Sequence, residues 1–319
     1  MPNNKNLAFV FPGQGSQSVG MMTALAAKYP AVQATYAEAS RILGYDLWDL
    51  VQNGPDTELN ITAKTQPALL TASVSMWRIW MNYGGLVPVQ MAGHSLGEYS
   101  ALVCAGALTF ADAVSLVADR GSYMQVAVPE GIGSMAAILG LTEVKVIDIC
   151  KQAAQGQIVA AANFNSSGQI VIAGHTEAVK RAVDAAKQAG AKRSVLLPVS
   201  VPSHCELMQE AARNFAKRIE TVMLSSLQIP VIHNVDVSQK TDTKAIKQAL
   251  VDQLYKPVRW VETIQAMAAK GITHIVECGP GKVLCGLIKR IDRQIQTLSI
   301  DNPMSLEKAL SEFNSEIAK

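Results

Sequence analysis

The most informative stretch of this chain is Gly93-His94-Ser95-Leu96-Gly97. Val89 to Met91 before it has the character of a strand end, and Leu96 to Ala105 that of a helix start. A serine between two glycines at a strand-to-helix turn is typical of a nucleophile elbow, because so sharp a bend needs small neighbours and exposes the hydroxyl. The helix amides beyond it can stabilise negative charge. The stretch predicts acyl transfer through a serine ester, and a plain tight turn is its alternative.

Composition limits the classes of protein that fit. The chain has 319 residues, 49% of them hydrophobic, which suits about two domains with large buried cores. The net charge is +2 without a dense Lys/Arg block, so we expect no nucleic-acid partner. No run of about 18 apolar residues is present, so we expect no membrane span. The five cysteines form no Cys-x-x-Cys motif, which indicates reduced thiols and a cytoplasmic protein.

Alternating strands and helices predict the larger domain. Leu7 to Phe11 is a continuously apolar run, typical of a buried parallel strand, and the glycine-rich turn Pro12 to Gln17 follows it. A helix is predicted over Phe110 to Gln125, and a late strand over Thr273 to Cys278. This order is typical of an α/β fold with a parallel sheet. We assign residues 1–127 and 201–319 to this catalytic domain.

Residues 128–200 have a different pattern, strand-helix-strand-strand-helix-strand. The strands are predicted over 133–139, 158–163, 169–173 and 193–199, and the helices over 143–153 and 177–189. Asn165-Ser166-Ser167-Gly168 would form the hairpin link between the second and third strands. This order is that of a ferredoxin-like module, so we expect a small domain inserted into the larger one.

A serine nucleophile needs a base, and His204 has the most informative context. Ser203 to Glu206 fits a capping box, which would place His204 in the first turn of a helix where the dipole favours neutral imidazole. A surface histidine at a helix start is the alternative. His274, near the C-terminus, lies where an ordinary α/β-hydrolase keeps its base and is the main rival. His94 adjoins the serine, and its expected role is to shape the pocket.

Two further positions have candidate roles with open alternatives. The Gln14 amide, between Gly13 and Gly15, can approach a ligand closely and serve with the Leu96 amide as an oxyanion donor. A simple β-α bend or a phosphate loop is the alternative for this turn. Arg120 either holds a substrate carboxylate or is a solvated residue near a helix C-terminus.

Taken together, the chain resembles the malonyl-CoA:acyl carrier protein transacylases of type II fatty acid synthesis. The resemblance spans essentially the whole length, in order. The matching segments are Phe11–Gln17, Gly93–Tyr99, Arg120-Gly121 with Met124-Gln125, Asn163–Asn165, Gly168–Gly174, Val201–Cys205, Asn234–Asp236, Gln253–Tyr255 before Pro257-Val258, and Glu277–Gly281.

This resemblance implies an α/β-hydrolase-like core with a ferredoxin-like insert, and it implies roles for individual residues. Ser95 would be the nucleophile and His204 the base. The amides of Gln14 and Leu96 would form the oxyanion hole, and Arg120 would bind the malonyl carboxylate. The backbone carbonyl of Gln253 would orient His204, and His94, Met124 and Asn163 would line the substrate site. Ser203 before the base accompanies bulkier extenders in polyketide relatives, but the stand-alone fatty acid enzymes carry it with malonyl.

The resemblance also implies the partners. The enzyme would take malonyl-CoA, form a malonyl-serine ester in a ping-pong reaction, and pass the malonyl group to the pantetheine thiol of acyl carrier protein, supplying fatty acid elongation. It implies no metal and no cofactor, and we expect a monomer. Two rivals stay open: a serine hydrolase using His274 with Asp236 or Asp252, and a non-enzymatic scaffold that binds acyl carrier protein.

Overall fold

Five parallel strands form the large sheet within residues 4–199 and 201–317, which this computed structural model describes. In spatial order they are β7 (Val231–Ile232), β2 (Pro88–Gly93), β1 (Asn4–Phe11), β8 (His274–Glu277) and β9 (Gln296–Ser299). The predicted domain ranges also include positions 1–3, 200 and 318–319, which lie outside the described residues.

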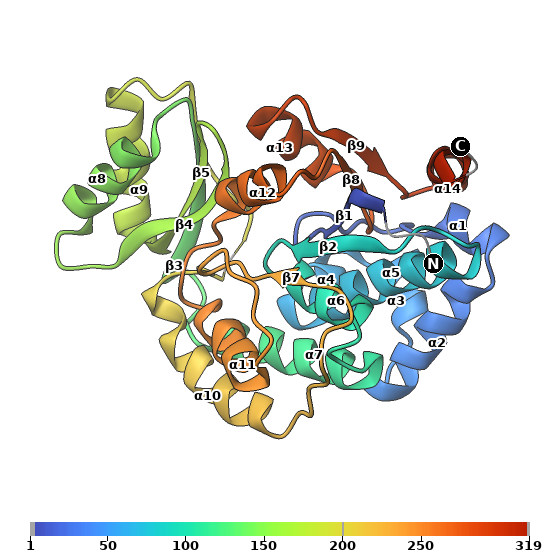
Figure 1. Ribbon diagram of the computed structural model, residues 1–319. Helices are drawn as coiled ribbons and strands as arrows, with labels where there is room; N and C mark the ends of the chain where they lie inside the picture. The colour runs from blue at the N-terminus through green and yellow to red at the C-terminus, as the bar shows by residue number, and fades with distance from the viewer. Residues whose placement is uncertain (1–3, 200, 318–319) are drawn as a thin grey trace.

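Strand β1 is apolar on both faces because helices cover both. Leu7, Phe9 and Phe11 belong to one buried cluster, and Ala8 and Val10 to another. This explains why β1 is a continuous apolar run rather than an alternating one. The second cluster is formed with α12 (Trp260–Ala269) and α13 (Val283–Ile291). Figure 1 shows these helices on one side of the sheet and α5 (Thr62–Asn82) and α6 (Gly97–Cys104) on the other.

The remaining helices of this part contribute to the first cluster or pack around it. They are α1 (Thr23–Lys28), α2 (Ala31–Leu43), α3 (Leu47–Asn53), α4 (Asp56–Leu59), α5 (Thr62–Asn82), α6 (Gly97–Cys104), α7 (Phe110–Val126), the 3-10 turn η1 (Glu206–Met208), α10 (Gln209–Glu220), α11 (Thr243–Asp252) and α14 (Pro303–Ile317).

Four antiparallel strands form a separate small sheet, which confirms the predicted fold class. In spatial order they are β4 (Val159–Ser166), β5 (Gln169–His175), β3 (Gly133–Leu139) and β6 (Arg193–Leu196). Helices α8 (Glu143–Ala154) and α9 (Thr176–Gln188) pack on one face. The hairpin link is shorter than predicted, because β4 continues through Ser166 and only Ser167 and Gly168 make the turn.

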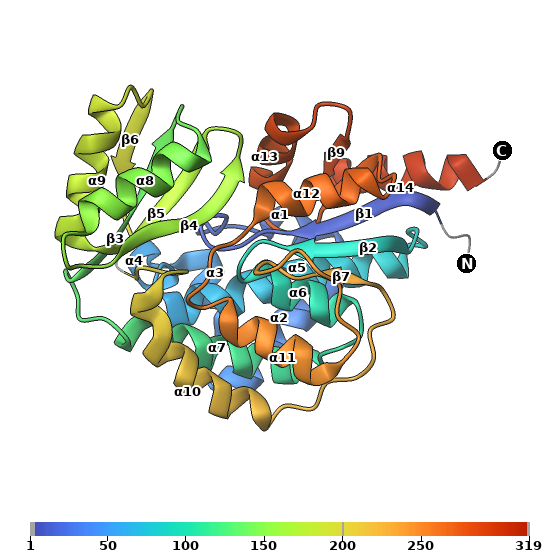
Figure 2. The same cartoon turned by 60° about the vertical axis from the view of Figure 1, so that its left-hand side comes forward.

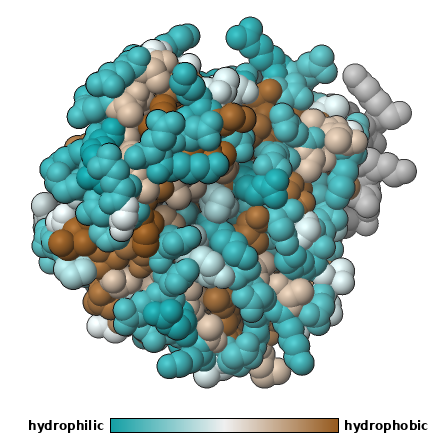
Figure 3. All heavy atoms as spheres, turned by 90° about the vertical axis from the view of Figure 1, so that its left-hand side faces the viewer, coloured by the Kyte–Doolittle hydropathy of each residue, from teal (hydrophilic) through white to brown (hydrophobic). Residues whose placement is uncertain are grey.

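The other face and one edge of the small sheet hold segments of the large part. On that face, Met135 and Val171 share a buried cluster with Cys205 and Leu207. At the edge, β4 pairs with the chain around Val258 through two backbone hydrogen bonds of 2.9 Å. Figure 2 shows the small sheet beside the segment that enters α12. Figure 3 shows the face on this side of the molecule, where hydrophilic side chains predominate and hydrophobic ones form separate areas.

The turn between β2 and α6 packs tightly against the end of β1. A Cβ at Gly97 would lie 2.0 Å from the carbonyl oxygen of Phe11, and one at Gly93 would lie 1.8 Å from the Gly97 carbonyl carbon. The His94 amide donates a 2.9 Å hydrogen bond to the same Phe11 oxygen. Positions 93 and 97 therefore have to be glycine, because a Cβ at either one would clash with backbone atoms.

Replacing Gly97 by alanine should lower the free energy of unfolding by about 1–3 kcal/mol or more, because its Cβ would displace backbone atoms. Urea unfolding measures the effect. Gly286→Ala is the matched control: Gly286 lies in α13 with no atom within 4 Å of its Cβ position, so this change should be neutral or stabilising by up to about 1 kcal/mol. Equal midpoints for the two variants would show that the turn is not tightly constrained.

Candidate active site

Ser95 lies in the turn after β2 with a left-handed backbone, at φ 51°. The carboxamide of Asn234 fixes this turn on both sides: its Oδ1 accepts from the Ser95 amide at 2.7 Å, and its Nδ2 donates to the Gly93 carbonyl at 2.7 Å. A non-glycine residue with positive φ at a tight turn is strained, and such strain needs support from its surroundings. Asn234 supplies part of it.

The structure brings His204 to Ser95 across 109 positions of sequence. Nε2 of His204 lies 2.8 Å from Ser95 Oγ, and Nδ1 lies 2.7 Å from the backbone carbonyl oxygen of Gln253. Since that carbonyl can only accept, Nδ1 carries the proton and Nε2 accepts from the serine hydroxyl. The ring is therefore oriented by a carbonyl.

The predicted capping box is wrong. The 3-10 turn η1 begins at Glu206, after His204, and Ser203 Oγ donates to Val201 O instead of capping a helix. His204 has φ 62°, and its amide donates to Leu254 O at 2.9 Å. It lies in a left-handed turn before the helical segment, so the dipole argument does not explain its neutral state.

Burial and a neighbouring cation supply that explanation instead. The His204 side chain is buried. Burial, followed by the charge of Arg120, lowers the pKa of His204 from its ordinary 6.5 to about 3, although the Gln253 carbonyl acts in the opposite direction. The imidazole is neutral at physiological pH and can accept a proton.

Arg120 is fully buried in α7, so its interpretation as a solvated residue is wrong. Its Nη1 donates to Gln66 Oε1 at 2.8 Å, and its Nη2 donates to Gln253 Oε1 at 2.9 Å. Nη2 also lies 3.5 Å from Ser95 Oγ. Burial lowers the pKa of Arg120, yet a guanidinium stays protonated in proteins. A fixed cation beside the serine can bind the carboxylate of an acyl group.

The two amides predicted as oxyanion donors are unused by the protein. Within residues 4–199 and 201–317, neither the backbone N–H of Gln14 nor that of Leu96 donates a hydrogen bond. Gly13 brings the first turn against the second: a Cβ there would lie 2.5 Å from the His94 carbonyl oxygen. The two turns therefore lie side by side at the carboxyl ends of β1 and β2.

The other candidate residues lie around these groups. His94 Nε2 is 2.8 Å from Asn165 Oδ1 on β4, and its ring packs edge-on against Trp260. Met124 is buried, with its sulfur 3.6 Å from Gln66 Nε2, the amide that also holds Arg120. Asn163 is buried on β4 and is the bridge partner of Val258.

His274 does not reach the serine, so the serine-hydrolase alternative is wrong in its choice of base. Leu7 pairs with His274, whereas Phe11 pairs with Gly93. His274 therefore lies level with Leu7 and Gly93 level with Phe11, four residues or about 13 Å further along β1, and Ser95 follows Gly93 at the carboxyl ends of the strands. His274 Nδ1 contacts Thr273 Oγ1 instead. The acids of that alternative pair elsewhere, Asp236 with Lys240 and Asp252 with Lys256.

Sequence reasoning missed the polar groups behind the site. Glu98 and His233 are fully buried and paired at 2.6 Å, and Glu98 Oε2 accepts from Gln253 Nε2 at 2.8 Å. Glu98 stands in the first turn of α6, where an acid is ordinary, and His233 directly follows β7. The available signal in the sequence was their position: Glu98 lies three residues after Ser95, and His233 directly precedes Asn234.

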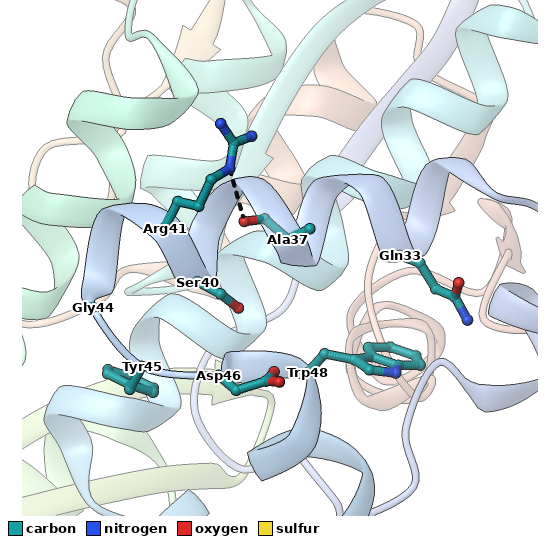
Figure 4. A pocket seen from close by; sticks show the side chains of 8 residues that line it. All are labelled: Gln33, Ala37, Ser40, Arg41, Gly44, Tyr45, Asp46 and Trp48. Carbon is teal, nitrogen blue, oxygen red and sulfur yellow. Dashed lines mark hydrogen bonds between the residues drawn. The ribbon is translucent and has the colours of Figure 1, made fainter.

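The described part of the chain also has a surface hollow, and it contains no cluster of metal ligands and no membrane-spanning helix. A surface hollow of about 610 Å³ lies on α2 and the turn into α3 (Figure 4), lined by Gln33, Ala37, Ser40, Arg41, Gly44, Tyr45, Asp46 and Trp48. No three His, Cys, Asp or Glu side chains between residues 4 and 317, position 200 excepted, cluster as metal ligands. None of the described helices is both long and apolar enough to cross a bilayer.

Comparison with known proteins agrees with this arrangement. The profile of the family described as acyl transferase domain matches residues 8–303. A malonyl CoA-acyl carrier protein transacylase of Salmonella typhimurium is 57% identical over 96% of this chain and 99% of that protein. The chain belongs to this transacylase family. It is therefore a transferase enzyme, and the predicted family is confirmed.

More distant relatives and solved structures agree with this membership. A Bacillus subtilis protein of the same name is 43% identical over 97% of this chain and 98% of that protein. The transacylase structure from Coxiella burnetii has a TM-score of 0.95 at 53% identity, covering 98% of both chains. A solved complex of a type II PKS acyl-carrier protein with its malonyl-transacylase contains a chain that matches with a TM-score of 0.96 at 54% identity, covering 96% of this chain and 99% of that one.

The lowered pKa of His204 predicts how Ser95 reactivity depends on pH. The neutral imidazole of His204 activates Ser95. The rate at which phenylmethylsulfonyl fluoride modifies Ser95 should therefore stay the same from about pH 7.5 down to about pH 5.5. With an ordinary pKa of about 6.5 the rate would fall about tenfold over this range. Mass spectrometry of the modified protein gives the rates. A midpoint near pH 6.5 would contradict the buried environment of His204.

Proposed function

We propose that this enzyme transfers the malonyl group from malonyl-CoA to the pantetheine thiol of acyl carrier protein, through a malonyl ester on Ser95, and so supplies fatty acid elongation. The observation that carries the proposal is the geometry at Ser95. Its hydroxyl lies 2.8 Å from a neutral imidazole and 3.5 Å from a buried guanidinium. A hydrolase that acts on neutral esters needs no cation beside the serine. An enzyme that binds an acyl group ending in a carboxylate does, because the guanidinium can pair with that carboxylate.

In the first half-reaction, Ser95 Oγ attacks the thioester carbon while its proton moves to His204 Nε2. The Gln14 and Leu96 amides stabilise the oxyanion, and Arg120 holds the malonyl carboxylate. The C–S bond then breaks, and His204 returns the proton to the departing CoA sulfur. The Gln253 carbonyl keeps the His204 ring in place through both proton transfers.

The second half-reaction reverses these steps with a different thiol. The pantetheine thiol of acyl carrier protein gives its proton to His204 Nε2 as its sulfur attacks the ester carbon. The C–O bond to Ser95 breaks, and the serine oxygen takes the proton back. Because the acyl group stays on the enzyme between the two steps, the kinetics are ping-pong.

One chain is sufficient for this chemistry in our proposal, because Ser95, His204 and Arg120 all belong to it and meet directly. We therefore propose a monomer, with residues 1–127 and 201–319 as the catalytic domain and 128–200 as the insert. The five cysteines are unpaired and buried, which supports a cytoplasmic location.

Incubation with malonyl-CoA should add one malonyl group to Ser95, seen by intact-protein and peptide mass spectrometry, and acyl carrier protein should remove it. His204→Ala should slow adduct formation by about 10³-fold or more, because it removes the base. His274→Ala is the matched control and should acylate at the parent rate, since His274 lies at the opposite edge of the sheet. No adduct, or equal losses in both variants, would refute the proposal.

Arg120→Ala should lower kcat/KM for malonyl-CoA by about 10²-fold or more while sparing or raising that for acetyl-CoA, which lacks the carboxylate. Steady-state transfer to acyl carrier protein, measured with both donors, tests this. Thermal melting of the variant controls for the loss of a buried side chain. Equal losses with the two donors would show that Arg120 is structural and does not bind substrate.

A further inference from the structure

Arg120 carries its charge in a fully buried position without an adjacent carboxylate. The two side-chain oxygens that accept from it at 2.9 Å or less belong to the neutral amides of Gln66 and Gln253. No Asp or Glu within the described ranges forms an ion pair with it. An uncompensated buried charge is strongly unfavourable. The face of the Tyr99 ring, whose centroid lies 5.3 Å from the guanidinium carbon, supplies part of the compensation, and a nearby anion would supply more.

Glu98 is the buried carboxylate closest to this arrangement in the hydrogen-bond network. The carboxamide of Gln253 connects the two charged groups: Oε1 accepts from Arg120 Nη2 at 2.9 Å, and Nε2 donates to Glu98 Oε2 at 2.8 Å. The same Nε2 donates to the Ser95 carbonyl at 3.0 Å. The cation and the anion are thus separated by one amide.

The donors around Glu98 require it to be a carboxylate. Three N–H groups point at its oxygens, from Gln253 Nε2, the Asn234 amide at 3.1 Å and His233 Nδ1 at 2.6 Å. Nε2 of His233 is buried and has no partner among the described residues. A charged imidazolium would bury an unpaired N–H there, so His233 is neutral and donates from Nδ1.

We propose that Glu98 is a positioning residue for the acyl-binding cation. It orients the Gln253 carboxamide so that Oε1 faces Arg120, and it compensates the buried charge from one amide away. This inference rests on the proposed function, in which Arg120 binds the malonyl carboxylate. A carboxylate in direct contact with Arg120 would compete with that group. Because the Gln253 carboxamide lies between Glu98 and Arg120, Glu98 does not compete with the malonyl carboxylate for the guanidinium. Arg120 Nε also has no hydrogen-bond partner within the described part of the chain.

Glu98→Gln tests the proposal because it keeps the shape and removes the charge. The introduced amide would direct its own N–H groups at donors, which favours a flipped Gln253 carboxamide and leaves Arg120 with one anchor fewer. We expect kcat/KM for Ser95 acylation by malonyl-CoA to fall about 10- to 100-fold, and that by acetyl-CoA to fall less than about threefold. Glu177→Gln, which removes an exposed acid on α9, is the control and should change neither value.

A double-mutant cycle separates positioning from a structural role. In an Arg120→Ala background, Glu98→Gln should leave the malonyl-to-acetyl ratio unchanged, because the cation that it positions is gone. Equal losses with both donors, or an undiminished effect in that background, would overturn the inference. Gln253→Glu keeps the backbone carbonyl and places a carboxylate beside Arg120. It should therefore also depress the malonyl-to-acetyl ratio, and this variant tests the idea even if Glu98→Gln does not fold.

The outcomes also separate this inference from the proposed function. If the parent enzyme forms no malonyl adduct on Ser95, the function and the inference both fail. If the parent forms the adduct and the ratio is the same in the parent, Glu98→Gln and Gln253→Glu, only the role of Glu98 fails.

Discussion

The close contact between the serine turn and the end of strand β1 is the constraint on which the site depends. The Phe11 carbonyl accepts from the His94 amide and leaves no room for a side chain at Gly97. Because β1 and β2 are parallel neighbours, the turns that follow them are held against each other. The amides of Gln14 and Leu96 consequently lie in adjacent turns, and neither bonds to the described protein. Asn234 hydrogen-bonds the turn on both sides and so helps to stabilise the left-handed backbone of Ser95.

The base is oriented by a neutral carbonyl, and this choice is consistent with the nearby cation. Arg120 lies 3.5 Å from the serine oxygen, so a carboxylate placed beside His204 would also attract the guanidinium. The carbonyl of Gln253 fixes the tautomer of His204 without adding negative charge. The negative charge lies instead on Glu98, behind the side chain of the same glutamine. Gln253 thus contacts the base through its backbone and the cation through its side chain.

The small sheet stabilises the segments that carry the base. One of its faces packs against Cys205 and Leu207, which follow the left-handed turn of His204. Its edge strand β4 pairs with the chain at Val258, shortly after Gln253. Asn165, also on β4, is hydrogen-bonded to His94 beside the nucleophile. The small sheet therefore contacts the segments that carry the base and also the residue next to the nucleophile, even though Ser95, His204 and Arg120 lie outside it.

Local sequence patterns suffice to predict the main secondary-structure elements, and they single out Ser95 and His204 as candidate reacting groups. Apolar runs and glycines in Leu7–Phe11 and Gly93–Gly97 act over a few residues, so β1, the elbow and the strand-helix order of the insert could be predicted. The resemblance supplied the roles of Ser95, His204 and Arg120. The environment of these groups, in contrast, depends on how distant segments pack in the folded chain. Burial of Arg120, the left-handed turn of His204 outside any helix, and the pairing of Glu98 with His233 arise from contacts between segments far apart in the sequence. Leu254, which accepts from the His204 amide, is 50 positions away, and Glu98 and His233 are 135 positions apart. Local patterns contain no information on such contacts, which is why the capping box at Ser203 was predicted wrongly.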